Sequence, residues 1–238
     1  AAVIGAGTMG RGIVISLASA GIPVLWLDNN PQMLEQGLKM IEDTWAQNVA
    51  KGRIEQGEAS LRLARVQTVA DYAALAPADL VIEAVYENLE LKQKIFRALD
   101  EVLKPGAILA SNTSALDIDA IAAVTRRPES VLGLHFFSPA HIMKLLEIVR
   151  GAKTAPAVLE AALALGQRIG KVSVVAGNCD GFIGNRMLHT YVKEARMLLL
   201  EGALPAQVDG ALQQFGFAMG PFRMYDVVGI DLEWRARE

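Results

Sequence analysis

The chain has 238 residues, of which 52% are hydrophobic and 21% are charged, and its formal net charge is -3. An apolar fraction of this size argues against a disordered chain, and the slightly acidic balance leaves no electrostatic footprint for nucleic acid. No apolar run approaches the roughly 20 residues of a membrane-spanning helix. The N-terminal residues AAVIGAGTMG show no feature of a secretory signal. We therefore expect a globular protein with no membrane span and no nucleic-acid partner.

The chain contains a single cysteine, Cys179. One cysteine excludes an internal disulfide and a cysteine-based metal cluster, and it is typical of a reducing compartment. No set of histidine and acidic residues has the spacing of metal ligands. We expect a cytoplasmic location, or an equally reducing organelle, and no bound metal.

Short apolar runs alternate with longer helical patterns as far as Val175. The helical patterns cover residues from about 9 to 20, then 31–50, 89–103 and 156–169, and the polar stretch KGRIEQGEASLR is expected to close a helical arm. The apolar runs predict strands at 2–5, 23–28, 64–69, 79–84, 107–110, 131–136, 145–149 and 171–175. This alternation favours an α/β fold, in which a doubly wound, mostly parallel sheet carries helices on both faces.

The pattern changes after Val175, because only helical signals follow, at 182–200, 205–215 and 221–228. The segment GNCDG, residues 177–181, is the expected boundary. We therefore expect two domains: an α/β domain at 1–177 and a smaller all-α domain at 178–238.

The segment GAGTMG follows the first predicted strand and opens the first predicted helix. In a G-x-G-x-x-G turn the glycines allow a tight bend, close approach of the backbone to a pyrophosphate, and close helix–strand packing. Asp28 ends the second predicted strand, where a carboxylate accepts hydrogen bonds from a ribose and repels a 2′-phosphate. These features predict a Rossmann-like domain that binds NAD rather than NADP. The expected cofactor-binding residues here are Gly5, Gly7, Thr8, Met9, Gly10 and Asp28.

Two other interpretations of this segment stay open. An adenine-linked flavin uses the same glycine pattern. The segment is also compatible with an ordinary glycine-rich turn in which Asp28 caps the helix that begins beside Pro31.

His135 ends the apolar run VLGLHF, and Glu147 lies in the middle of another, KLLEIV. A carboxylate within a buried strand is unfavourable unless it is paired. If the two strands are neighbours, Glu147 orients His135, and the second imidazole nitrogen is left to act as a general base. The alternatives are a histidine satisfied within the core and a structural ion pair of Glu147 with Lys144 or Arg150.

A polar cluster, SNTS, follows the predicted strand at 107–110. Its side chains either present donors to a substrate and cofactor or cap the helix expected near Leu116. Asn185 follows a glycine-rich lead-in to the helical domain and is either a cap or a donor to the substrate. His141 and His189 have no comparable context and are interpreted as structural.

The chain resembles the L-3-hydroxyacyl-CoA dehydrogenases of fatty-acid β-oxidation over essentially its whole length. The segments that carry the resemblance are GAGTMGRGI, EAVYENLELKQKIF, SNTSAL, HFFSPAHIMKLLEIV, GNCDGFIGNR and GFAMGPFRMYDVVGID. The form HFFSPAHIMKLLEIV and the basic tail WRARE are most similar to the dehydrogenase part of multifunctional β-oxidation enzymes. The resemblance implies NAD-dependent oxidation of an L-3-hydroxyacyl-CoA to a 3-oxoacyl-CoA.

The resemblance also implies roles for particular residues. His135 is expected to take the proton of the 3-hydroxyl group while hydride passes to nicotinamide C4, and Glu147 is expected to orient His135. Ser114 and Asn185 match positions that bind the substrate. The positions Glu87, Lys92 and Asn112 match residues that contact the cofactor. Without the resemblance, Glu87 and Lys92 would be interpreted as a helix-start acid and a solvated lysine.

In this family the helical domain continues beyond a segment like GPFRMYDVVGID, so we expect the chain to hold only the first part of that domain. A homodimer, or packing against other parts of a longer polypeptide, is expected. The competing enzyme class is the β-hydroxyacid dehydrogenases of small free acids, which use a catalytic lysine on the long helix after the α/β domain; Lys193 lies in that region. A non-catalytic protein that retains the dinucleotide site is the other alternative.

Overall fold

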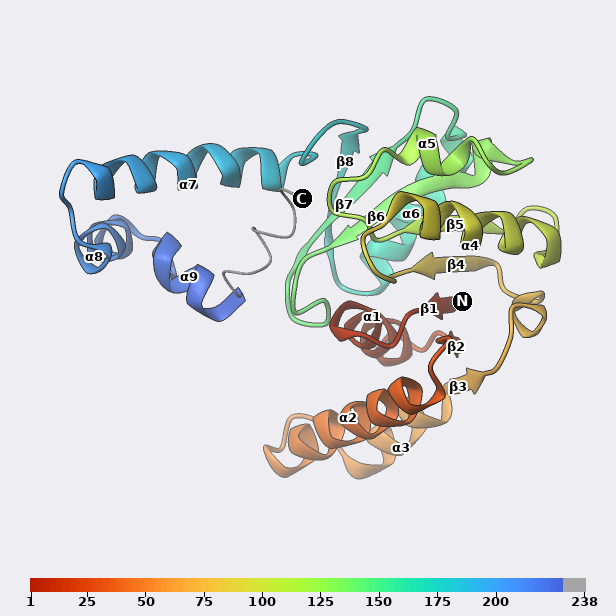
Figure 1. Ribbon diagram of the computed structural model, residues 1–238. Helices are drawn as coiled ribbons and strands as arrows, with labels where there is room; N and C mark the ends of the chain where they lie inside the picture. Colours follow the sequence, from red (N-terminus) through yellow and green to blue (C-terminus); the bar gives the residue numbers. More distant parts are fainter. Residues whose placement is uncertain (229–238) are drawn as a thin grey trace. The chain divides into compact units, whose positions relative to one another are not determined.

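The structure is a computed structural model that describes residues 1–228 (Figure 1). The WRARE tail singled out in the sequence lies outside the described residues. The chain divides into two compact units, the first ending at Phe182 and the second beginning at Ile183. The first unit includes the segment after the last strand because Asn178 donates to Asp117 and Asp119, and because Phe182 is buried.

A single eight-stranded sheet forms the centre of the first unit. Its strand order is β3-β2-β1-β4-β5-β6-β7-β8, and the strands from β1 to β6 are parallel. The bounds are β1 Ala2–Ile4, β2 Val24–Leu27, β3 Val66–Val69, β4 Leu80–Glu83, β5 Ile108–Ser111, β6 Val131–Phe136, β7 Leu145–Arg150 and β8 Val172–Gly177. The expected doubly wound, mostly parallel sheet is confirmed.

Strand β7 reverses the direction of the sheet, because it pairs antiparallel with β6, and β8 pairs parallel with β7. Parallel neighbours need a crossover connection, usually a helix. Only the loop at 137–144 joins β6 to β7, so no helix intervenes and the chain returns directly. This return places residues of β7 beside the carboxyl end of β6.

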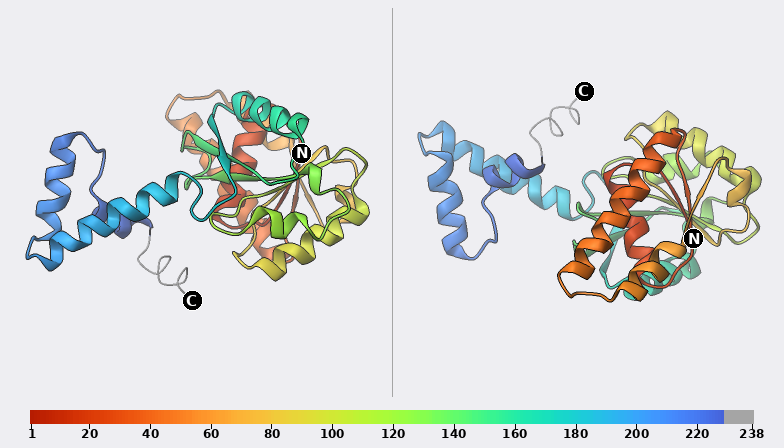
Figure 2. Two further views of the ribbon diagram at one scale, coloured as in Figure 1. Left: turned by 90° about the horizontal axis from the view of Figure 1, so that it is seen from above. Right: turned by 90° about the horizontal axis from the view of Figure 1, so that it is seen from below.

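Helices cover both faces of the sheet (Figure 2). Helices α1 and α6 lie on one face, where their apolar residues join a core with Val3, Ile82 and Leu134 of the strands, whereas α4 and α5 lie on the other. The helices of this unit are α1 Thr8–Ser19, α2 Pro31–Ala50, α3 Gln56–Ala64, α4 Leu89–Val102, α5 Ile118–Ala122 and α6 Pro156–Arg168. The helical arm expected after α2 is closed by α3, which packs against α2.

The second unit is helical, as expected, and its described part contains α7 Gly184–Leu200, α8 Pro205–Phe215 and α9 Pro221–Val228. Gly216 caps the C-terminus of α8 in a left-handed backbone conformation (φ 117°) that suits glycine. The carboxylate of Asp209 accepts hydrogen bonds from the first turn of α9, at 3.0 Å from both Phe222 N and Arg223 N. Among the helices of residues 1–228, none has the length and apolar character needed to cross a bilayer.

The carboxyl ends of the parallel strands form one edge of the sheet. The register aligns Ile4 with Glu83, Glu83 with Ser111, and Ser111 with Gly133. Strand β6 continues three residues beyond Gly133, to Phe136. In open α/β sheets ligands bind at this edge. Most of the residues singled out in the sequence lie here.

Candidate active site

The turn between β1 and α1 contains three glycines, and they are suited to their positions for different structural reasons. Gly5 has φ 107°, and a Cβ atom there would lie 2.5 Å from the carbonyl oxygen of Ala84. A Cβ atom on Gly10 would overlap the carbonyl oxygen of Gly5. Gly7 is different, because a Cβ atom there would meet nothing within 4 Å. Packing therefore requires Gly5 and Gly10, whereas the open space at Gly7 fits the approach of a pyrophosphate to the backbone.

Helix α1 begins at Thr8, directly after this turn, with Gly7 as its N-cap and no side chain capping its N–H groups. Thr8 and Met9 lie in the first turn, where N–H groups and the helix dipole favour an anion. The residues present therefore fit the phosphates of a dinucleotide.

Asp28 follows β2 and holds the glycine turn in place. Its Oδ2 accepts a hydrogen bond from Ala6 N at 2.7 Å, and its Oδ1 accepts one from Asn30 N at 2.8 Å. Asn30, not Asp28, is the N-cap of α2, since the Asn30 side chain accepts from Gln32 N at 3.0 Å. The alternative in which Asp28 caps this helix is therefore wrong. The half-buried carboxylate lies beside the turn, as a ribose-binding residue would.

His135 and Glu147 are direct cross-strand partners on the antiparallel strands β6 and β7. Their side chains form a hydrogen bond of 2.7 Å between Nδ1 and Oε2. Both side chains are buried, with exposed fractions of 7% and 1%. Because Nδ1 bonds to the carboxylate, the chemistry of this imidazole is left to Nε2.

Two aromatic rings enclose the imidazole of His135. The ring centroid of Phe137 lies 4.4 Å from that of His135, and the centroid of Phe182 lies 5.7 Å away. Lys144 and Arg150, the other partners considered for Glu147, are exposed residues at the ends of this segment. The geometry therefore favours the orienting interaction over a surface ion pair.

Asn112 connects the ends of two strands beside His135. Its Oδ1 accepts a hydrogen bond from Phe136 N at 2.9 Å, and its own N–H donates to the carbonyl oxygen of Glu83 at 2.8 Å. The cluster at 111–114 does not cap α5, because Asp117 is the N-cap and accepts from Asp119 N at 2.8 Å. Asn112 is thus a bracing residue at the edge expected to receive the nicotinamide.

Lys92 is buried, with a side chain that is only 1% exposed. The interpretation of Lys92 as a solvated lysine is therefore wrong. Its Nζ lies 2.7 Å from Oε1 of Glu83 and 3.3 Å from Oε2 of Glu87. Glu87 precedes α4, whose N-cap is Asn88, and Glu87 Oε1 accepts from Ser114 N at 2.9 Å. The structure therefore brings Ser114 beside Glu87 and Lys92, which belong to an earlier segment of the sequence.

Glu83 was missed in the sequence. This residue ends β4 in the run LVIE and is fully buried. The signal that would have found it is the one that drew attention to Glu147, namely a carboxylate within an apolar strand.

Asn185 lies in the first turn of α7, in the second unit. It is therefore described with that unit, whereas the other predicted site residues belong to the first. Within residues 1–228, no group of three or more His, Cys, Asp or Glu side chains has an arrangement that would hold a metal ion.

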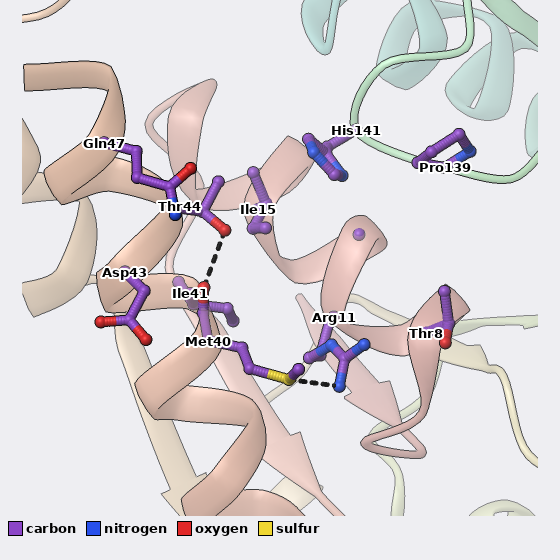
Figure 3. Close-up of a pocket in the computed structure, with 11 residues that line it drawn as sticks. Thr8, Arg11, Ile15, Met40, Ile41, Asp43, Thr44, Gln47, Pro139 and His141 are labelled. Carbon is purple, nitrogen blue, oxygen red and sulfur yellow. Dashed lines mark hydrogen bonds between the residues drawn. The ribbon is translucent and has the colours of Figure 1, made fainter. Parts of the chain in front are cut away.

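A cleft of about 320 Å³ opens between α1, α2 and the loop after β6 (Figure 3). His141, interpreted from the sequence as structural, projects from this loop toward the cleft (Figure 3). Partial desolvation and the ammonium group of Lys171 lower the pKa of His141. The cleft is lined by Thr8, Arg11, Gly12, Ile15, Met40, Ile41, Asp43, Thr44, Gln47, Pro139 and His141. No sequence pattern pointed to this cleft, because its walls come from three separate segments.

Comparisons with known proteins agree with this geometry. Residues 1–179 match a family model described as the NAD binding domain of 3-hydroxyacyl-CoA dehydrogenase, and residues 181–238 match the model of its C-terminal domain. The chain is 50% identical over 238 residues to a peroxisomal bifunctional enzyme of Danio rerio, covering 100% of this chain but 32% of that protein. The chain thus spans about a third of the length of such curated relatives.

Solved structures give the same result. A 3-hydroxybutyryl-CoA dehydrogenase from Escherichia coli has a TM-score of 0.93 and 42% identity, and the alignment covers 97% of this chain and 49% of that one. The dehydrogenase part of a multifunctional enzyme from C. elegans has a TM-score of 0.71 and 30% identity, covering 99% of this chain and 59% of that one. The chain belongs to the 3-hydroxyacyl-CoA dehydrogenase family, and its first unit is the NAD-binding domain of that family.

Proposed function

We propose that this chain catalyses the NAD-dependent oxidation of an L-3-hydroxyacyl-CoA to a 3-oxoacyl-CoA, as a step of fatty-acid β-oxidation. The observation that carries the proposal is the buried pair of His135 and Glu147, joined at 2.7 Å on the same edge of the sheet as the glycine turn. A base and a dinucleotide site on one edge of the sheet are what proton and hydride removal from one carbon requires.

The residues expected to hold the cofactor follow from the turn and the strand ends. Backbone groups of the turn at Gly7 and the first N–H groups of α1 face the pyrophosphate, and Asp28 accepts from the ribose hydroxyls. The negative charge of Asp28 disfavours the 2′-phosphate of NADP. When bound, NAD supplies the hydride acceptor at nicotinamide C4. The chain itself must align the substrate and accept one proton.

His135 accepts that proton. Its Nε2 takes the proton of the 3-hydroxyl group as the C3–H bond breaks, and the imidazole becomes an imidazolium. Glu147 holds Nδ1 at 2.7 Å, which fixes the ring orientation and compensates the new positive charge. Phe137 and Phe182 enclose the imidazole and limit the access of water to this pair. A positioned base typically contributes about 10²–10⁴-fold to the rate.

Ser114 and Asn185 are the proposed donors to the substrate. The CoA part needs a polar surface with a cation for its phosphates. The cleft beside α1 offers Arg11 and Thr44, and its wall includes Pro139 from the loop that follows the strand of His135. This continuity between the cleft and the catalytic strand supports an acyl-CoA substrate over a small free acid.

The second unit presents apolar side chains that suit further packing. Met187, Leu200 and Phe215 have exposed fractions of 70%, 81% and 82%. Monomeric proteins rarely leave large apolar surfaces uncovered. These residues support either a homodimer or packing against other parts of a longer polypeptide. A reducing intracellular compartment remains our proposal for the location, and the names of the peroxisomal relatives favour the peroxisome.

The test uses the full-length protein and follows NADH oxidation at 340 nm with acetoacetyl-CoA and, in parallel, with free acetoacetate. We expect turnover with the CoA ester and little with the free acid. Turnover with the free acid alone would favour the small-acid class, with Lys193 as the candidate catalytic lysine. NADH binding without turnover of either compound would favour a non-catalytic dinucleotide-binding protein.

A further inference from the structure

A second buried carboxylate lies at the carboxyl edge of the sheet, two strands from His135. Glu83 is fully buried at the end of β4, and each of its oxygens has partners. Oε1 accepts from Lys92 Nζ and from Val85 N, both at 2.7 Å, and Oε2 accepts from Ser111 Oγ at 2.7 Å. The mechanism proposed above gives Glu83 no role.

The burial of this ion pair is not explained by stability. Removing two charges from water is expensive, and replacing a buried ion pair with apolar residues is often neutral or stabilising. Lys92 projects from α4, a helix whose other inward residues include Ile95, Phe96 and Leu99. An apolar side chain at position 92 would suit this surface. We therefore expect the ion pair of Glu83 and Lys92 to have a role other than holding α4 on the sheet.

The contacts of this ion pair extend to a partly exposed carboxylate, Glu87. Lys92 Nζ lies 3.3 Å from Oε2 of Glu87, whose side chain is 38% exposed. The other oxygen of Glu87 accepts hydrogen bonds from Thr113 Oγ1 and from Ser114 N. One ammonium group thus lies between a buried carboxylate and an exposed one, and the exposed one binds the loop after β5.

We infer that Glu83 and Lys92 are positioning residues that hold Glu87 against the loop after β5. This inference rests on the proposed function, together with the expectation from the family resemblance that Glu87 and Asn112 contact the cofactor and that Ser114 binds the substrate. The carboxylate of Glu83 holds the ammonium group of Lys92 in position. That ammonium group holds the Glu87 carboxylate, which in turn accepts a hydrogen bond from Ser114 N in the loop after β5. The two loops that leave β4 and β5 are thereby held at one separation, which sets the space for the nicotinamide end of the cofactor.

The test removes the charges of Glu83, Lys92 and Glu87 by substitution in the full-length protein and compares the effects. The variants are Glu83→Gln, Lys92→Met, the double variant of the two, and Glu87→Gln. The matched controls are Glu101→Gln and Lys94→Met, exposed positions on the same helix as Lys92. Two quantities are measured for each protein: the Kd of NADH, from its fluorescence, and the Tm.

Lys92→Met leaves the buried carboxylate of Glu83 without its ammonium, and Glu83→Gln leaves Lys92 with only the more distant carboxylate of Glu87, so we expect a lowered Tm in both. The double variant leaves no unpaired buried charge, so its Tm should recover. The Kd of NADH should nevertheless stay raised in the double variant, by about ten-fold or more, as for the loss of one charge-assisted hydrogen bond. Glu87→Gln should raise the Kd of NADH similarly but change the Tm little, because the ion pair of Lys92 with Glu83 is retained.

Recovery of both the Tm and the Kd of NADH in the double variant would overturn the inference and leave a purely structural pair. An unchanged Kd in Glu87→Gln would overturn it as well, because Glu87 is the group that the pair is inferred to position. If the single variants fail to fold, the double variant and Glu87→Gln still decide. NADH binding is measured without acyl-CoA, so an absence of dehydrogenase turnover would overturn the proposed function but not this inference.

Discussion

Buried carboxylates lie near both edges of the sheet, one on a strand and one on a helix, but the partners of these carboxylates differ. At the carboxyl edge, Glu147 lies 2.7 Å from Nδ1 of His135, the imidazole proposed as the catalytic base. Near the opposite edge, at the end of α4, Asp100 has a side chain that is 5% exposed and lies between two guanidinium groups. Arg126 Nε donates to one oxygen at 2.8 Å and Arg127 Nε to the other at 2.7 Å.

This difference distinguishes Asp100, a structural carboxylate, from Glu147, for which a chemical role is proposed. The guanidinium groups near Asp100 also donate to main-chain oxygens, from Arg126 to Asp100 O at 2.8 Å and from Arg127 to Lys104 O at 2.8 Å. Guanidinium groups cannot lose a proton under ordinary conditions, so both partners of Asp100 keep their positive charge. The role proposed for the imidazole beside Glu147, in contrast, requires a group that accepts a proton during turnover and then releases it. Burial of a carboxylate is therefore no guide to function until its partner is known.

The largest effect is expected from His135→Ala at the carboxyl edge. Loss of the base should lower kcat by about 10²–10⁴-fold, while the Kd of NADH stays near its original value, because the imidazole is not expected to hold the cofactor. Steady-state kinetics and NADH fluorescence measure the two quantities. His189→Ala, an exposed position on α7, is the matched control. Near-normal turnover in His135→Ala would remove this residue from the mechanism.

Glu147→Gln should give the next largest effect. The amide keeps the shape of the side chain but not its charge, so the imidazolium that forms during turnover is no longer compensated. We expect a folded protein with kcat lowered by about ten-fold or more, a smaller loss than that from removal of the base itself. Glu160→Gln on the exposed face of α6 is the control. If Glu147→Gln instead fails to fold, Glu147 has a structural role like that of Asp100.

Asp28 allows a test of the cofactor choice at the same edge. Asp28→Ser should raise the KM for NAD and reduce the preference for NAD over NADP, because the 2′-phosphate no longer meets a negative charge. The ratio of the kcat/KM values for the two cofactors is the measurement. An unchanged ratio would mean that the Asp28 carboxylate serves only to hold Ala6 N and Asn30 N.

Asp100→Asn should produce the reverse of the carboxyl-edge variants: reduced stability, by about 2 kcal/mol, with kcat unchanged. Burial raises the pKa of the Asp100 carboxyl, but hydrogen bonds from Arg126 and Arg127 outweigh it and hold that pKa below its ordinary value. Its contribution to stability is therefore present above about pH 4 and is lost as the pH falls through the lowered pKa. Urea unfolding as a function of pH should show the variant and the parent converging in acid. A persistent difference there would assign the effect to packing.

Much of the fold follows from local patterns in the sequence. Alternation of apolar runs and helical periodicity predicted the strands, and the glycine turn with Asp28 predicted the position of a dinucleotide site. The carboxylate within KLLEIV pointed to a buried partner for Glu147, since a charged group in a strand must be paired. These inferences depend on neighbours in the sequence or on one pair of strands.

The contacts between distant segments were not predictable in this way. Lys92 has the context of a surface lysine, and only the packing of α4 against β4 buries it beside Glu83. The cleft beside α1 is formed where α2 and the loop at 137–144 come together. Neither arrangement has a local signature, because each depends on how helices pack on the sheet.

The most direct test of the central claim is a double-mutant cycle on kcat for His135→Ala and Glu147→Gln, measured as acetoacetyl-CoA-dependent NADH oxidation. If Glu147 acts through the imidazole, its substitution has nothing left to affect once His135 is gone. We therefore predict that the double variant has the same kcat as His135→Ala. If the two losses instead multiply, Glu147 acts independently of His135, and the pair does not function as one catalytic unit.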